Sequence, residues 1–186
     1  MKTDHASHTY SRRCTNLTRR IQVLIVGFGK DHCPEIAYRA AYQVGMEIAR
    51  HGAVLLNGGL GGVMEAASRG AKDIGGFVIG IIPQDDKAEV NEFCDAVIAT
   101  GMGFARDFIT AYSADAVIVV GGGAGTLIEI AAAYQKKIPI VALKGTGGIA
   151  DRLVDTYIDD RKLERVFGEN TPEKTVSTAL ALIGVT

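Results

Sequence analysis

Six short runs of apolar residues, rich in valine and isoleucine, recur along the chain. Within each run the apolar positions are nearly continuous and do not alternate with polar ones. This pattern is typical of parallel strands that are covered on both faces, because a strand with one wet face would alternate. The predicted strands are Ile21–Val26, Ala53–Leu56, Phe77–Ile82, Ala96–Ala99, Ala116–Val120 and Ile138–Leu143.

Segments with helical periodicity lie between most of these strands. The clearest runs from Pro34 to His51, starts at a proline suited to a first helical turn and stops before Gly52. The other predicted helices are Val63–Ile74, Phe104–Ser113, Leu127–Lys136, Ile149–Tyr157 and Pro172–Ile183. Alternation of strand and helix predicts a single α/β domain, a doubly wound and mostly parallel Rossmann-like sheet with helices on both faces.

Glycine collects after the predicted strands, at the carboxyl edge where open α/β sheets bind ligands. The strand ends read GFGK (27–30), NGGLGG (57–62), GGGAGT (121–126) and KGTGG (144–148). One such loop is explained by a tight turn alone. Several on one edge favour a phosphate, because glycine backbone approaches a ligand closely and the start of a helix attracts anions. The candidate ligand-binding residues are Gly27, Gly29, Asn57, Gly58, Gly59, Gly61, Gly122, Gly123, Ala124, Gly125 and Thr126.

The first loop does not complete the dinucleotide fingerprint. Gly27 and Gly29 fit its first two glycines, but His32 holds the third position. Asn57 sits near the end of the second strand, where an acid would bind a ribose diol. The chain also lacks the G-K-[ST] of a P-loop. We therefore expect a mononucleotide or a phosphoester of similar size, and we disfavour NAD.

Thr126 and Glu129 have the spacing of a capping box, in which the threonine caps a helix and the glutamate reaches back. Glu129 would then stabilise the helix start. The same carboxylate is also placed to do chemistry beside a bound phosphate. Both interpretations stay open on the local pattern.

The composition limits the classes of partner that the sequence supports. The 186 residues are 47% hydrophobic and 22% charged with net charge −1, which points to neither nucleic acid nor an anionic membrane. No apolar run approaches the ~20 residues of a membrane span. Cys14, Cys33 and Cys94 are odd in number and widely spaced, which indicates free thiols and a cytoplasmic location. No histidine joins them at metal-ligand spacing, so no metal site is expected.

The first twenty residues differ from the remainder. They carry five lysines and arginines against Asp4, a net +4, which leaves −5 for the rest of the chain. We interpret 1–20 as a basic arm without regular structure and 21–186 as the folded domain. An organelle transit peptide and a misplaced start codon are the alternatives for the arm.

The string GGGAGTLIE (121–129) resembles the PGGxGTxxE motif of the LOG family, the cytokinin-activating phosphoribohydrolases once labelled lysine decarboxylases. Gly121 replaces the proline of that motif. NGGLGGVMEAASRGA (57–71) and GGFVIGIIP (75–83) resemble further family segments, and Arg106 precedes Glu129 by 23 residues, which is the family spacing. The strings IPQDDKAEVNEF, ATGMGFARDF and SADAVIVVGGGAGTLIEIA are closer to a prokaryotic branch related to molybdenum cofactor carrier proteins.

The resemblance implies two functions. One is hydrolysis of the N-glycosidic bond of nucleoside 5′-monophosphates, with Glu129 and Arg106 as catalytic residues and no cofactor required. The other is a non-catalytic carrier of molybdenum cofactor, a phosphorylated pterin, or a sensor of a nucleotide. Three departures from the LOG pattern cast doubt on hydrolysis: Asp107 replaces a lysine, Gly103 and Thr110 replace methionines, and Glu65 replaces a glycine.

The resemblance also implies a homodimer or a higher homo-oligomer. The predicted helix Leu127–Tyr134 is apolar enough to pack on more than its own sheet, and so permits such an interface. Burial of the same residues in the core is the alternative.

Overall fold

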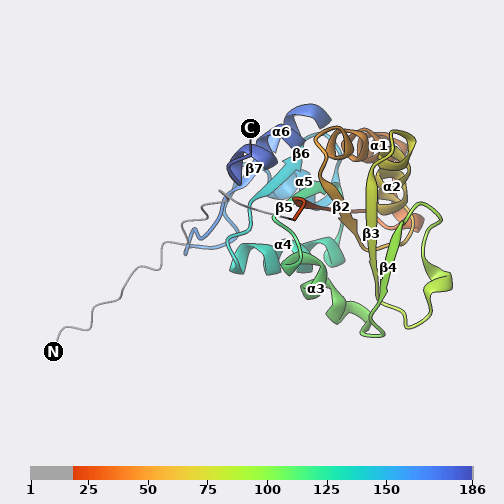
Figure 1. Ribbon diagram of the computed structural model, residues 1–186. Coiled ribbons are helices and arrows are strands. Elements are labelled where there is room, and N and C mark those ends of the chain that lie inside the picture. The colour runs from red at the N-terminus through yellow and green to blue at the C-terminus, as the bar shows by residue number, and fades with distance from the viewer. Residues whose placement is uncertain (1–18, 186) are drawn as a thin grey trace.

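The computed structural model describes residues 19–185 and contains one seven-stranded parallel sheet between two layers of helices (Figure 1). The strand order is β4-β3-β2-β1-β5-β6-β7. Strands β2 to β4 therefore lie on one side of β1 and strands β5 to β7 on the other, which places the switch point of the sheet between β1 and β5. The strands are β1 (Gln22–Gly27), β2 (Val54–Asn57), β3 (Phe77–Ile82), β4 (Ala96–Ala99), β5 (Ala116–Val120), β6 (Ile140–Leu143) and β7 (Val166–Glu169). The predicted fold class is confirmed.

The continuous apolar runs follow from burial on both faces of the sheet. On β1, Val23 and Ile25 enter one core cluster, whereas Leu24 and Val26 enter the other. The first cluster is completed by α1 (Glu35–Arg50), α2 (Val63–Asp73) and α6 (Pro172–Leu182). The second is completed by α3 (Arg106–Tyr112), α4 (Ala124–Gln135) and α5 (Gly148–Leu153). The 3-10 turns are Lys30–His32, Lys87–Glu89 and Gly103–Ala105.

Several element boundaries differ from the prediction. The edge strand β7 was not predicted, since VFGE is short and contains a glycine. Strand β6 begins only after Pro139, which has no backbone N–H to give to a ladder. The predicted helix 104–113 divides into a 3-10 turn and α3, and the helix predicted to begin at Leu127 begins at Ala124.

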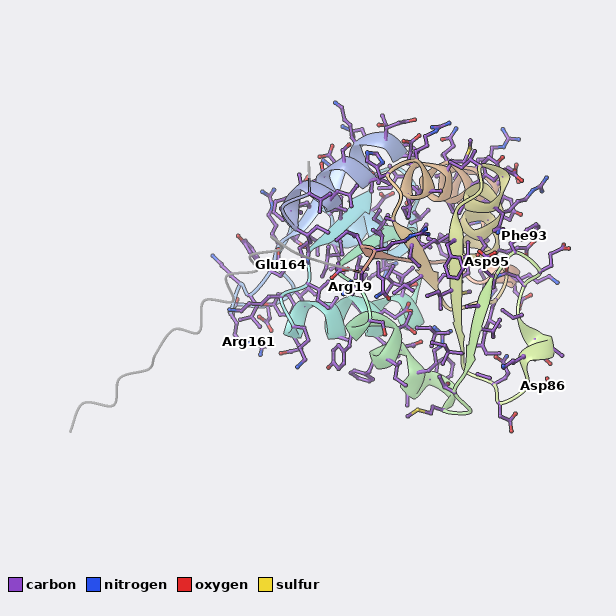
Figure 2. The ribbon with its side chains drawn as sticks, in the orientation of Figure 1. Arg19, Asp86, Phe93, Asp95, Arg161 and Glu164 are labelled. Atoms are coloured by element: carbon purple, nitrogen blue, oxygen red, sulfur yellow. The ribbon has the colours of Figure 1, made fainter. Side chains whose placement is uncertain are left out.

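The described chain starts close to the sheet. Arg19, which is labelled in Figure 2, forms two hydrogen bonds of 2.7 Å to the carboxylate of Asp115, and this carboxylate also accepts the backbone N–H of Gln22. The basic arm predicted for 1–20 otherwise falls on residues 1–18, which lie outside the described part. Arg19 is thus attached to the amino-terminal side of β5.

Within residues 19–185, no helix is long and apolar enough to cross a membrane. The same stretch contains no group of three or more histidine, cysteine, aspartate or glutamate side chains that could hold a metal ion. Cys33 and Cys94 are free thiols, and burial raises the pKa of Cys94 to about 11. A thiol with such a pKa is a poor nucleophile at neutral pH. Cys14 lies outside the described residues.

Candidate functional site

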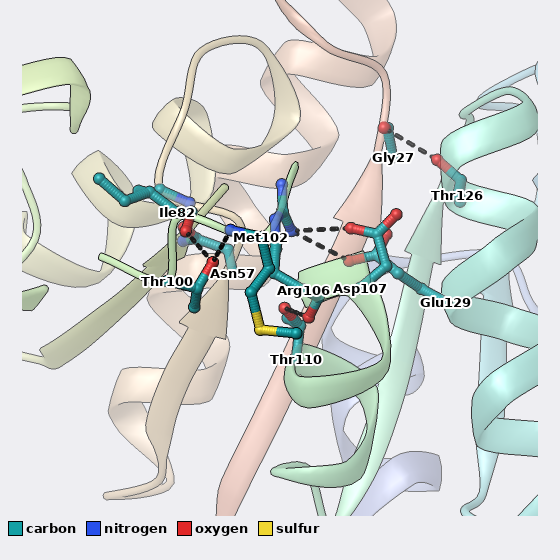
Figure 3. A network of polar contacts seen from close by, with 11 residues as sticks. Gly27, Asn57, Ile82, Thr100, Met102, Arg106, Asp107, Thr110, Thr126 and Glu129 are labelled. Carbon is teal, nitrogen blue, oxygen red and sulfur yellow. Dashed lines mark hydrogen bonds and ion pairs between the residues drawn. The ribbon is translucent and has the colours of Figure 1, made fainter. Parts of the chain in front are cut away.

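Loops from three strands meet at the switch point between β1 and β5. The hydroxyl of Thr126 donates to the carbonyl of Gly27 across 3.0 Å, which joins the β5 loop to the end of β1 (Figure 3). The β2 loop packs on the same place, since a Cβ on Gly62 would lie 2.4 Å from the carbonyl oxygen of Phe28. The glycine-rich segments of β1, β2 and β5 are therefore neighbours in space.

The segment Gly121–Thr126, which we call the glycine cradle, ends β5 and begins α4. Gly121 and Gly122 have φ values of +64° and +95°, which favour glycine. Gly123 is the N-cap of α4, is exposed, and has no side-chain capping bond. The first turn of α4 contains no acidic residue. The free N–H groups at this helix start can bind an anion.

The predicted capping box is wrong. The helix begins three residues earlier than expected, so Thr126 lies inside its first turn and donates to Gly27. Glu129 does not reach back to the helix start, because its carboxylate faces Arg106 on the neighbouring helix. Thr126 thus connects α4 to the end of β1, and Glu129 connects α4 to α3. Neither side chain caps the helix.

The β2 loop is held from within. Asn57 is fully buried, its amide donates to the Ser68 hydroxyl at 2.8 Å, and its carbonyl accepts the N–H of Gly59 at 2.7 Å. Both ends of this side chain are thus engaged by the protein. A ligand contact from the predicted set Asn57, Gly58, Gly59 and Gly61 would come from backbone atoms.

Two other glycine segments have structural explanations of their own. A Cβ on Gly27 would lie 2.1 Å from the carbonyl oxygen of Val120, so close packing of β1 on β5 requires glycine there. In the loop after β6, the N–H groups of Gly145 and Gly147 donate to the carboxylate of Asp151 at 2.8 and 2.9 Å. The N–H groups of the loop after β6 are therefore already occupied by the carboxylate of Asp151. Gly29, by contrast, is exposed, with open space where a side chain would be.

A buried charged cluster lies beside the cradle. Arg106, the first residue of α3, is only 8% exposed. Its Nη1 lies 3.2 Å from Oδ1 of Asp107 and 3.6 Å from Oε1 of Glu129 (Figure 3). The guanidinium also rests against the β2 loop, since a Cβ on Gly58 would lie 2.6 Å from both terminal nitrogens. The predicted pair Arg106 and Glu129 is therefore adjacent, and a surface position for Arg106 is excluded.

Two carboxyl groups share the single guanidinium of this cluster. The pKa of Glu129 is raised to about 8, chiefly by burial and also by the neighbouring Asp107, against the opposing effect of Arg106. Burial also raises the pKa of Asp107, against the effect of Arg106. At neutral pH one proton therefore resides mainly on Glu129, and the cluster is close to neutral. Nε of Arg106 is buried with no hydrogen-bond partner within the described residues.

Sequence reasoning missed two contributors to the site. Thr146, from the loop after β6, accepts the N–H of Gly121 at 2.9 Å and so fixes the start of the cradle. Lys30 lies against Gly61, where a Cβ would approach its side chain to 2.9 Å. Only their positions in the sequence could have identified Lys30 and Thr146, because each follows a strand at the glycine-rich edge of the sheet.

Comparison with known proteins identifies relatives of the chain. A family model described as the SLOG cluster4 family matches residues 20–176. An uncharacterized protein of Archaeoglobus fulgidus is 50% identical over 124 residues, which cover 67% of this chain and 80% of that protein.

Solved structures extend the comparison. The molybdenum cofactor binding protein from the phototrophic bacterium Rippkaea orientalis is 34% identical with a TM-score of 0.80, over 90% of this chain and 99% of that one. The molybdenum cofactor carrier protein of Chlamydomonas reinhardtii is 34% identical with a TM-score of 0.74, over 89% and 99% of the two chains. DNA processing protein A from Helicobacter pylori, at 16% identity and a TM-score of 0.62, shares the fold.

Proposed function

Since the chain belongs to the SLOG cluster4 family, we propose that it holds a small phosphorylated heterocycle of the molybdenum cofactor class in its glycine cradle. The observation that carries the proposal is the uncapped start of α4, which has an exposed glycine at the N-cap and no acid in its first turn. Such a helix start is suited to a phosphate monoester. The two relatives named for this cofactor, each 34% identical over about nine tenths of the chain, support the choice of a pterin.

The charged cluster would act on the same ligand. Nε of Arg106 is buried and has no hydrogen-bond partner among residues 19–185, so a charge-assisted hydrogen bond from it to the ligand would add to the affinity. A protonated Glu129 would donate a hydrogen bond and not accept a proton. A general base must be ionised to activate water, and a carboxyl with a pKa of about 8 is mostly protonated at pH 7. The arrangement therefore favours holding the ligand over cutting it.

Titration with the cofactor tests this proposal. Molybdenum cofactor released anaerobically from a molybdoenzyme is mixed with the protein, the mixture is passed over a desalting column, and the pterin that elutes with protein is oxidised and measured by fluorescence. We expect retention that saturates near one pterin per chain. Retention no greater than that of an unrelated protein of similar size would contradict the proposal.

Hydrolysis of nucleoside monophosphates is a second candidate, favoured by the 3.6 Å approach of Arg106 to Glu129. If Glu129 is the base, release of free base from AMP, GMP, IMP, CMP or UMP should rise with pH through about 8, because the active form is the ionised carboxylate. Glu129→Gln should abolish the release while ligand binding persists. No free base at pH 7 or pH 9, at high enzyme concentration, would eliminate this candidate.

We also propose that the protein is a homodimer or a higher homo-oligomer. The sequence suggested the apolar residues of α4 as the interface, but most of them are buried in the core of the chain itself. These buried residues are Ile130, Ala132, Ala133 and Tyr134. A group of exposed apolar side chains lies on α3, in the turn before it and at the start of α4, and we call this group the α3 patch. It consists of Met102, Phe104, Phe108, Ile109, Tyr112 and Leu127. Aromatic side chains exposed in this way are typical of interfaces.

Substitution in the α3 patch tests the assembly. Phe104 is 80% exposed and Phe108 47% exposed, so Phe104→Asp with Phe108→Asp should fold normally yet yield a monomer by light scattering at micromolar concentration. Ile74→Asp, at another exposed apolar residue, is the control and should leave the assembly intact. A wild-type monomer at this concentration would contradict the proposal.

We place the protein in the cytoplasm, in keeping with the free thiols of Cys33 and Cys94.

A further inference from the structure

A groove of about 580 Å³, lined by polar and apolar residues alike, adjoins the cradle at the carboxyl edge of the sheet. One wall is the start of α1, with Ile36, Arg39 and Gln43. The other comes from the loop after β6, with Thr146, and from Asn170, just before α6. The groove lies over the strands beyond the switch point, where the second half of an extended ligand rests in doubly wound sheets.

Thr146 connects the groove to the cradle. It lines the groove, and its hydroxyl accepts the N–H of Gly121 at 2.9 Å. The cluster of Arg106, Asp107 and Glu129 belongs to α3 and α4, whereas α1 and α6 cover the opposite face of the sheet. A phosphate on the cradle would therefore have the buried charged cluster on one side and the open groove on the other.

We propose that the groove is a second subsite, which binds the nucleoside half of a dinucleotide whose pyrophosphate lies on the glycine cradle. This inference rests on the proposed function, because it requires the cradle to hold phosphate. It extends that function from a monophosphate to a two-part ligand, with one heterocycle beside Arg106 and Glu129 and the other in the groove.

The lining of the groove suits a nucleoside. Gln43 and Asn170 are exposed, and each amide offers both donors and an acceptor to the edge of a base. Ile36 is 61% exposed and presents an apolar surface to the face of a base. Arg39 pairs only with Glu35 among the described residues, through two side chains that are 77% and 70% exposed. Such a pair is weak, so the guanidinium is available to stack on a base or to meet a phosphate.

Recognition of this dinucleotide would differ from that of NAD. The β1 loop has His32 where the fingerprint has its third glycine, and Asn57 is buried and fully hydrogen-bonded where an acid would bind a ribose. The uncapped helix start follows β5 and not β1. The pyrophosphate would thus lie one strand further toward β6, which brings the second nucleoside over the groove.

Calorimetric titration with diguanosine and diadenosine diphosphates, each beside GMP and AMP, tests the subsite. We expect at least one dinucleotide to bind ten times or more tightly than its mononucleotide. Ile36→Asp combined with Gln43→Ala should remove this advantage while mononucleotide affinity stays within about twofold. Both positions are exposed on α1, so the fold should tolerate the change. Ile74→Asp is the matched control and should keep the advantage.

Equal affinity for mononucleotide and dinucleotide, or an advantage that survives the groove variant, would overturn the subsite and leave the phosphate cradle standing. If neither class of nucleotide binds, the subsite is overturned as well. Retention of pterin by the same protein preparation then decides the proposed function separately, so that the two failures are distinguishable.

Discussion

Gly123→Asp is expected to lower affinity for the phosphorylated ligand by about a hundredfold or more. The new carboxylate would stand at the start of α4, where a free anion would otherwise bind, and would both occupy the N–H groups and repel the phosphate. The fold should tolerate it, since a Cβ at Gly123 meets nothing within 4 Å and aspartate is a favoured N-cap residue. Pterin retention and circular dichroism on the same samples measure both effects.

Two control variants isolate the charge at the cradle. Gly123→Ala adds the Cβ without the carboxylate and should keep affinity within a fewfold. Gln135→Glu adds a negative charge at the far end of α4, where residue 135 is exposed, and should bind like wild type. Full ligand retention by Gly123→Asp in a folded protein would show that the start of α4 is not the phosphate site.

Glu129→Gln is expected to make the protein more stable than wild type at alkaline pH. The folded-state pKa of Glu129 is about 8, against an ordinary value of 4.5. Between these values the native state binds a proton that the unfolded chain releases, so wild-type stability falls as pH rises through this window and levels off above it. Glutamine does not ionise. The variant should therefore gain several kcal/mol on wild type by pH 9, at about 1.4 kcal/mol per pKa unit.

Urea unfolding at intervals from pH 5 to pH 9 measures this effect. At pH 5 the two proteins should differ by about 1 kcal/mol or less, because pH 5 lies just above the ordinary pKa of 4.5, where the loss of wild-type stability has only begun. Glu89→Gln, at an exposed position, should follow the wild-type curve and serves as the control. Parallel curves for wild type and Glu129→Gln would mean that Glu129 is ionised in the native protein, and would weaken the case for a non-catalytic site.

The strands and the glycine-rich edge could be predicted because burial on both faces imposes a continuous apolar pattern. The same logic failed for β7, whose four residues carry a glycine and lie at the edge of the sheet, where little burial is required. It also misplaced the start of α4. A glycine N-cap leaves no side-chain signal, so the sequence pattern indicates Thr126 as the cap, whereas Gly123 is the N-cap in the structure.

The electrostatic character of the site could not be predicted from the sequence. Asp107 was visible as an acid beside Arg106, but its effect depends on both side chains being buried against Glu129, which lies on another helix. The roles of the glycines were equally hidden. Gly27 is required by packing against Val120, and the loop at Gly145 and Gly147 binds Asp151, whereas the cradle leaves an exposed helix start without a side-chain cap or an acid in its first turn.

Native mass spectrometry of protein purified from cells that make molybdenum cofactor tests the central claim most directly. We predict that wild-type protein carries a phosphorylated pterin, with or without molybdenum, that Glu129→Gln carries it too, and that Gly123→Asp does not. Wild-type protein free of any such ligand, although the same cells supply cofactor to a co-expressed molybdoenzyme, would contradict the account.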